Sequence, residues 1–143
     1  MIEPSDSVLM DKGFIGTIAR LTLENIDDPD FCQNSSYAIY VTSESMESKS
    51  QVTEFFHEIK GFDLISALFK LHNSNDAICF NCISILIKII INFPGLMEIG
   101  ISFKPLFKSG LIETIAFIME KSKDDSFVKL CELFFTIIVS SSK

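Results

Sequence analysis

The chain has 143 residues, of which 48% are apolar and 14 are Phe, so it can bury a core and is not a disordered segment. Its net charge is −7, and residues 1–60 hold the excess, with 11 acidic against 4 basic side chains. Phosphate binding needs clustered Lys and Arg, so this balance argues against nucleic acid as a partner. The acidic half indicates either a solvated surface or a docking face for a basic partner.

The first predicted unit covers residues 7–46 and contains two clear helices after a short stub. Apolar residues at helical spacing predict a helix over 14–24, which the polar run 25–28 ends. Asp28 followed by Pro29 is typical of a helix start, because the carboxylate accepts from free amides and Pro has no amide to leave unpaired. The next helix is expected to run from about Pro29 through Val41 and to fade into a Ser-rich loop.

The second predicted unit covers residues 51–93 and opens with a helix over 52–60. Its apolar residues follow an i, i+3, i+4, i+7 stripe, and we expect Gly61 to end it in a left-handed turn. A further helix is expected over 62–72, followed by a polar loop.

The longest predicted helix of the second unit covers residues 77–93, with Asn75 or Asp76 as its cap. It is apolar nearly all round, so we expect neighbouring helices to cover both of its sides. It is also the one candidate membrane span. Because it is short for a bilayer and contains Asn81 and Lys88, we do not expect it to insert in a membrane.

The third predicted unit covers residues 96–143. After a segment interrupted by Pro105, Gly110 opens a helix over 111–121, and a helix over 126–139 with Asp125 as its cap follows. No later element is available in the sequence to cover the outer side of this last helix. Its apolar residues Phe134, Phe135 and Ile138 are therefore expected to form an uncovered end.

The three units share a repeat. Gly13, Gly61 and Gly110 are spaced 48 and 49 residues apart, and the same residue types follow each of them. The shared positions are an aromatic or Leu (Phe14, Phe62, Leu111), an Ala (Ala19, Ala67, Ala116), Asn or Ser (Asn25, Asn73, Ser122) and Asp (Asp28, Asp76, Asp125). We interpret the three Asp residues as helix caps rather than as a carboxylate cluster.

The cysteines and histidines are interpreted as structural. Cys82 and Cys131 occupy equivalent apolar positions, where reduced Cys behaves as a small hydrophobe. Cys79 and Cys82 have CxxC spacing without a second pair or a nearby His, so no metal or other cofactor is expected. Neither His57 nor His72 belongs to a recognisable catalytic motif.

Each unit has the same order of elements, namely a short helix, a glycine, a second helix, a polar loop and a longer capped helix. This order resembles the armadillo repeat over about 130 residues. The resemblance implies an all-α, right-handed α-solenoid of about three repeats in one domain, residues 1–143, with a small helix bundle as the structural alternative. It also implies a non-enzymatic protein whose third helices line a groove. Importin-alpha-like members read basic nuclear signals with Trp and Asn. This chain has no Trp, and Ile39, Ile87 and Thr136 stand where the Asn ladder would fall, so that ligand is not expected.

We therefore expect an interaction module for a protein or peptide partner, located in the cytoplasm, with the nucleus as an alternative. The polar residues expected to line its surface are Gln33, Asn34, Glu54, Asp63, Asn81 and Lys88. The alternative function is a subunit of a larger assembly, or a self-associating chain, that docks through Phe134, Phe135 and Ile138 of the last helix, because a large exposed apolar patch is usually an interface.

Overall fold

The computed structural model describes residues 14–44, 55, 60–92, 108 and 110–141. Over these residues the chain is all-α, as predicted, and contains six helices and no strand. The helices are α2 (Phe14–Glu24), α3 (Pro29–Ser43), α5 (Gly61–Leu71), α6 (Asp76–Asn92), α8 (Leu111–Lys121) and α9 (Asp125–Ser141). Both α2 and α8 have the predicted bounds. The helix expected over 52–60 lies outside the described residues except for Phe55 and Lys60.

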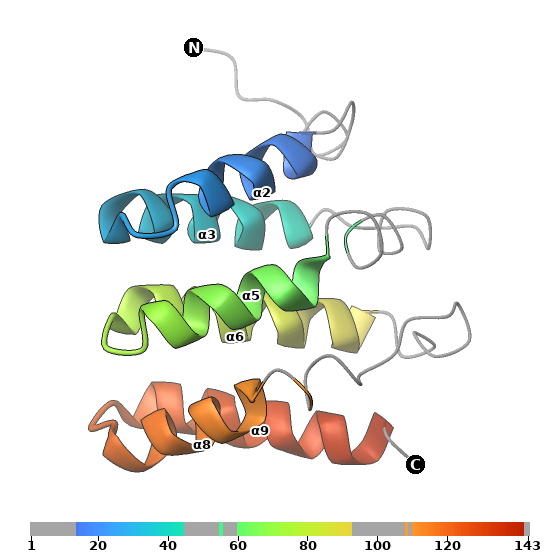
Figure 1. Ribbon diagram of the computed structural model, residues 1–143. Helices are drawn as coiled ribbons and strands as arrows, with labels where there is room; N and C mark the ends of the chain where they lie inside the picture. The colour runs from blue at the N-terminus through green and yellow to red at the C-terminus, as the bar shows by residue number, and fades with distance from the viewer. Residues whose placement is uncertain (1–13, 45–54, 56–59, 93–107, 109, 142–143) are drawn as a thin grey trace.

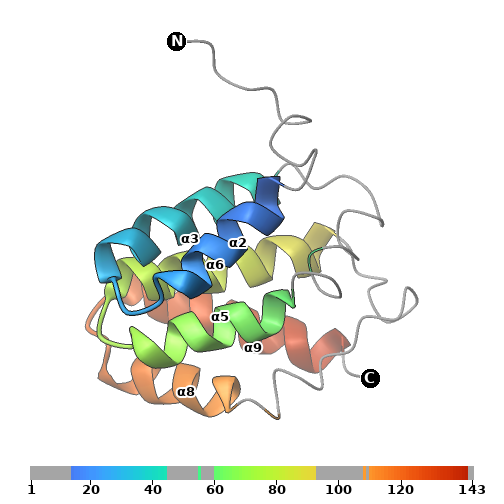
Figure 2. The same cartoon turned by 45° about the horizontal axis from the view of Figure 1, so that its top comes forward.

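The six helices form three hairpins, α2–α3, α5–α6 and α8–α9, which are stacked one on the next (Figure 1). Helices α2, α5 and α8 form one layer, and α3, α6 and α9 form the second layer behind it (Figures 1 and 2). In the second layer α6 packs between α3 and α9, and it also packs on α5. This central position explains why α6 is apolar nearly all round, since its neighbours bury most of its side chains.

The start of each second-layer helix is held by a side-chain cap. Asp28 Oδ1 accepts from the Phe31 amide at 3.1 Å, and Asn75 Oδ1 accepts from the Ile78 amide at 3.0 Å. In the last hairpin the cap is Asp124, whose Oδ1 accepts from the Ser126 and Phe127 amides at 2.9 and 3.3 Å. The prediction that Asp125 is the cap is therefore wrong. Asp125 is instead the first residue of α9, where a negative charge suits the helix dipole.

The two glycines at the starts of the first-layer helices α5 and α8 have different roles. Gly110 has φ +79°, a left-handed conformation that favours glycine, directly before α8. Before α5 the left-handed residue is Lys60, with φ 58°, and not Gly61 as expected. Gly61 is the buried first residue of α5, and a Cβ there would overlap the Phe55 ring. Close packing, rather than backbone conformation, therefore explains this glycine.

The core lies between the two layers and along α6. Its largest fully buried side chains include Phe55, Phe69 and Phe134. Both Cys82 and Cys131 are fully buried, as their equivalent positions predicted. None of the helices within the described ranges is long and apolar enough to cross a membrane.

Candidate interaction face

One face of the second layer points away from the first layer, and we call it the outer face. We number each second-layer helix from its cap residue, Asp28, Asn75 or Asp124, which is position 0. The outer face then consists of positions 2, 5, 9 and 16 of each helix. At 100° per residue these positions lie opposite the buried positions 7 and 14. The outer face contains Asp30, Gln33, Tyr37 and Glu44 on the α3 side, Ala77, Phe80, Ser84 and Ile91 on α6, and Ser126, Lys129, Leu133 and Ser140 on α9.

Large apolar side chains gather on this outer face. Tyr37 is 58% exposed, Phe80 42%, Ile91 53% and Leu133 44%. They come from all three hairpins and lie at equivalent outer positions of their helices, and we call these four residues the apolar band. Tyr37 also packs beside Tyr40, with ring centroids 6.4 Å apart. Exposed large apolar side chains that share one face of a protein are typical of a binding surface.

Two hollows flank the middle of the band. One of about 200 Å³ lies between the three second-layer helices and is lined by Tyr40, Ser84, Ile87, Lys88, Ile91 and Leu130. The positively charged side chain in this lining is that of Lys88, which is half-buried. Burial, followed by the carboxylate of Glu44, raises the pKa of the Tyr40 hydroxyl, so Tyr40 stays a neutral donor.

The second hollow, of about 290 Å³, lies at the opposite end of α6. It is lined by Asp76, Ala77, Phe80, Asn81, Asp124 and Phe127. Two carboxylates therefore lie beside the exposed Phe80 ring, whereas Lys88 lies near the other end of the same helix. The charges on α6 therefore change from acidic at its start to basic near its end, where the Glu44 carboxylate of the α3 side also lies close to Tyr40.

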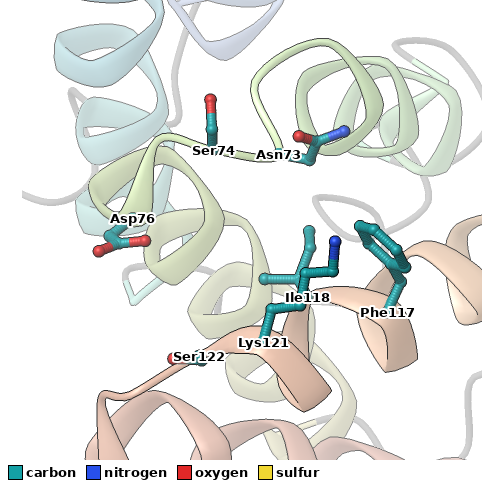
Figure 3. A pocket seen from close by; sticks show the side chains of 7 residues that line it. All are labelled: Asn73, Ser74, Asp76, Phe117, Ile118, Lys121 and Ser122. Carbon is teal, nitrogen blue, oxygen red and sulfur yellow. The ribbon is translucent and has the colours of Figure 1, made fainter.

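A third and larger hollow, of about 350 Å³, lies between the α5–α6 loop and the end of α8 (Figure 3). In Figure 3 Asp76 lies on the opposite side of this hollow from Phe117 and Lys121. Lys121 Nζ is 4.1 Å from the centroid of the half-exposed Phe117 ring, an arrangement that favours a cation over the aromatic face. This hollow belongs to the edge of the molecule and not to the outer face.

The polar residues that the sequence predicted for one binding surface lie in different parts of the structure. Gln33 and Asn34 are exposed on α3, and Lys88 lines a hollow of the outer face. Asp63 is exposed in the first turn of α5, so it belongs to the other layer. Glu54 lies outside the described residues.

Asn81 differs from its expected role because it is only 9% exposed. Its Nδ2 donates to the Gln33 carbonyl at 3.3 Å and to Ser36 Oγ at 3.0 Å. These bonds join α6 to α3, and a buried amide is kept only when it is paired in this way. Asn81 therefore links two hairpins, with little of its side chain left for a partner.

The apolar end expected on the last helix also differs. Phe134 and Ile138 are buried in the core, and Phe135 is partly buried with its ring 5.9 Å from that of Phe134. The physical reason is helical periodicity, which turns positions 134 and 138 toward α6 and the first layer. The exposed apolar residues of α9 are instead Leu133 and Val139.

Four residues of the apolar band, Tyr37, Phe80, Ile91 and Leu133, were missed by the sequence prediction. That prediction expected the third helices to line a groove, but it looked mainly for polar residues on them. The signal was nevertheless present, because these residues lie opposite the buried positions of their helices when each helix is counted from its cap.

The four thiols are a second cluster of chemically reactive residue types, but burial suppresses their reactivity. Desolvation, followed by Asp76, raises the pKa of Cys79 to about 12, and desolvation, followed by Glu132, raises that of Cys131 to about 11. Burial raises the pKa of Cys82 and Cys32 as well. A thiol held protonated is a poor nucleophile and metal ligand. Among the described residues no three His, Cys, Asp or Glu side chains are grouped to hold a metal ion.

Comparison of the chain with protein-family models, with curated proteins and with solved structures found no match. The armadillo resemblance therefore depends on the repeat pattern in the sequence alone, and any function has to be argued from the outer face itself.

Proposed function

We propose that the chain is a non-enzymatic interaction module of the cytoplasm or nucleus, an α-solenoid of armadillo-like repeats whose outer face binds a segment of a partner protein. The observation that carries this proposal is the apolar band of Tyr37, Phe80, Ile91 and Leu133, which crosses all three hairpins. A few residues supply most of the binding energy in protein interfaces, and aromatic side chains such as Tyr are prominent among them.

The charges around the band favour a partner with basic residues beside its apolar anchors. Asp76 and Asp124 line the hollow next to Phe80, and Asp30 lies exposed in the first turn of α3. Lys88 at the other end of α6 suits a carbonyl or carboxylate of the partner. A bound segment would thus have a preferred direction, with its basic part over the start of α6.

The alternative function, a subunit that docks through Phe134, Phe135 and Ile138, has less support. Phe134 and Ile138 are buried in the core, so they offer no surface to another chain. What favours α9 as an interface is a different residue, Val139, which is 60% exposed.

A selection from a random peptide library displayed on phage tests the proposed function. The full chain is the bait, and enriched peptides are synthesised and titrated by fluorescence anisotropy. We expect them to combine large apolar residues with Lys or Arg. Replacing Phe80→Glu or Ile91→Glu should weaken their binding at least about tenfold, because each removes an apolar anchor and adds a charge.

The matched control is Val139→Glu, an equally drastic change at an exposed position of α9 outside the outer face, which should leave peptide affinity unchanged. Circular dichroism confirms that each variant is folded. Failure to enrich any peptide, or enriched peptides that bind the Phe80→Glu and Ile91→Glu variants as well as the original chain, would contradict the proposal.

A further inference from the structure

In Figure 1 the second-layer helices follow one another downward in the order α3, α6, α9. Positions 4, 8, 11 and 15, counted from the cap, lie on one side of each helix at 100° per residue, and we call that side the lower face. On α3 these positions are Cys32, Ser36, Ile39 and Ser43, and on α6 they are Cys79, Ile83, Leu86 and Ile90. All eight residues are buried, because α6 packs on α3 and α9 packs on α6.

The same four positions are much more open on α9, where they hold Val128, Glu132, Phe135 and Val139. Glu132 and Val139 are exposed, and Val128 and Phe135 are only partly buried. Three of these residues are apolar, as in a face built for packing, and Glu132 places one carboxylate where Ser36 and Ile83 stand in the other hairpins. The lower face of α9 therefore has the pattern of a stacking surface on which no helix of the described ranges is stacked.

The opposite, upper face of each second-layer helix consists of positions 3, 6, 10 and 13. On α6 it is Ile78, Asn81, Ile85 and Lys88, and on α9 it is Phe127, Leu130, Phe134 and Ile137. On α3 the same positions hold Phe31, Asn34, Ala38 and Val41, of which Asn34 is exposed and the other three are partly buried. This face of α3 is thus also more open than its counterparts, and it again combines apolar residues with one Asn.

The bonds of Asn81 show how an upper face fits on a lower face. From position 6 of α6 its amide donates to the carbonyl at position 5 of α3 and to the side chain at position 8, which are those of Gln33 and Ser36. At the same positions the open faces carry Asn34, the Lys129 carbonyl and the Glu132 carboxylate. A donor therefore stands on one open face and two acceptors stand on the other.

We propose that the partner of the α9 lower face is the α3 upper face of a second copy of this chain, so that copies stack head to tail as the hairpins stack within one copy. In this contact Asn34 of one copy donates to Glu132 and to the Lys129 carbonyl of the next, as Asn81 does to Ser36 and Gln33. The Glu132 carboxylate takes the place of the Ser36 hydroxyl and is charged, which strengthens the hydrogen bond from Asn34. Such a contact does not close on itself, and it produces chains of copies whose length increases with concentration.

The charge of Glu132 decides between this arrangement and a two-fold pairing of α9 with α9. Glu132 lies near the middle of the lower face, so a two-fold axis through that face would bring the two Glu132 carboxylates close together among apolar residues. Like charges in such a contact disfavour it. The upper face of α3 presents an amide at the corresponding place and avoids this repulsion.

Sedimentation velocity on the full chain, at concentrations up to about 1 mM, tests the proposal. We expect the average mass to rise with concentration beyond that of a dimer. Asn34→Asp, which sets a carboxylate against Glu132, and Val139→Glu, which charges the apolar lower face, should each make the chain monomeric. Both residues are exposed, so both variants should fold, as circular dichroism can verify.

Mixing the two variants is the decisive measurement. The Asn34→Asp chain keeps an intact lower face and the Val139→Glu chain keeps an intact upper face, so the mixture should form a one-to-one dimer and nothing larger. The control is Leu133→Glu on the outer face of α9, which should self-associate like the original chain and, by contrast, lose peptide affinity if the outer face binds peptides.

Three results would overturn the proposal. The first is an original chain that stays monomeric at every concentration. The second is association that Val139→Glu abolishes and Asn34→Asp leaves intact, which indicates a two-fold contact through α9. The third is association that Leu133→Glu abolishes, which indicates a contact through the outer face. The proposal does not depend on peptide binding, and each of the two can fail while the other holds.

Discussion

The most informative single residues are the buried cysteines, because their environment converts a reactive group into a packing group. Each thiol is raised in pKa chiefly by desolvation, and neighbouring acids add to the effect for Cys79 and Cys131. The pair Cys79 and Cys82, which has the spacing of a metal or redox motif, thus lies inside α6 with both thiols protonated. Spacing alone does not distinguish these two situations, since only burial decides the protonation state.

Because of these thiols, we expect the free energy of unfolding to decrease at alkaline pH. A group whose pKa is raised by folding stabilises the folded chain below its unfolded pKa and loses that contribution as the pH rises toward its folded pKa. For Cys79 this window runs from its ordinary value of 9.0 to about 12, and for Cys131 from 9.0 to about 11. When the pH rises from 7 to 10, we expect the free energy of unfolding to fall by roughly 1 kcal/mol for each of these two thiols.

Urea unfolding at pH 7 and pH 10, with a reducing agent present, measures this loss. The variant Cys131→Ala is the control, since it removes one titrating thiol and should reduce the pH dependence by the share of that residue. A free energy of unfolding that is unchanged between the two pH values would show that the thiols ionise as readily in the folded chain as in the unfolded chain. An equal change in the variant would show the same for Cys131.

At the scale of elements, the helix starts follow local hydrogen bonding more closely than they follow the repeat. Asp28, Asp76 and Asp125 occupy equivalent positions in the sequence, yet only Asp28 is a cap. In the other two hairpins the residue one position earlier, Asn75 or Asp124, binds the free amides. Both residues are good caps, so the sequence alone leaves the starting residue open by one position.

The neighbouring acids Asp124 and Asp125 permit a direct test of this assignment. Asp124→Ala should destabilise the chain by about 1 kcal/mol, because two amides at the start of α9 lose their acceptor. Asp125→Ala should cost only about 0.3 kcal/mol, since it removes a favourable charge near the helix dipole and no cap. Thermal and urea unfolding give both values, and a larger loss for Asp125→Ala would assign the cap to Asp125 after all.

At the scale of the whole molecule, a few polar contacts set how one hairpin sits on the next. Asn81 joins α6 to α3, and His72 Nε2 lies 2.6 Å from the Ile26 carbonyl, which joins the α5–α6 loop to the α2–α3 loop. Apolar packing supplies most of the attraction between hairpins, but it tolerates sliding. Paired buried polar groups have a fixed geometry, so they favour one alignment of the stack.

The variant Asn81→Ala tests this contribution. It should lower the free energy of unfolding by about 1 to 2 kcal/mol, because a buried hydrogen-bonded amide is lost between two hairpins. The control is Gln33→Ala, which removes an exposed side chain from α3 and retains the carbonyl that accepts from Asn81. Gln33→Ala should change the free energy of unfolding by no more than about 0.5 kcal/mol. Equal effects of the two variants in urea unfolding would show that the Asn81 bonds do not hold the stack.

The helices and their order follow from the sequence because they depend on local signals. Apolar spacing, caps and glycines are read within a few residues of each other, and they placed α2 and α8 at their observed bounds and the other four helices within two residues or so. The burial of Cys82 and Cys131 also followed, since equivalent positions of a repeat share one environment.

Helical periodicity determines which side chains share a side of a helix, but tertiary structure decided which of those sides is covered by a neighbouring helix. Phe134 and Phe80 are both aromatic residues of second-layer helices, yet Phe134 is buried and Phe80 is exposed, because only one of them faces a neighbouring helix. Asn81 is polar and was expected to meet a partner, but α3 supplies its hydrogen-bond acceptors. Residue type determines what a side chain can do, and the position of the neighbouring hairpins determines whether anything outside the chain can reach it.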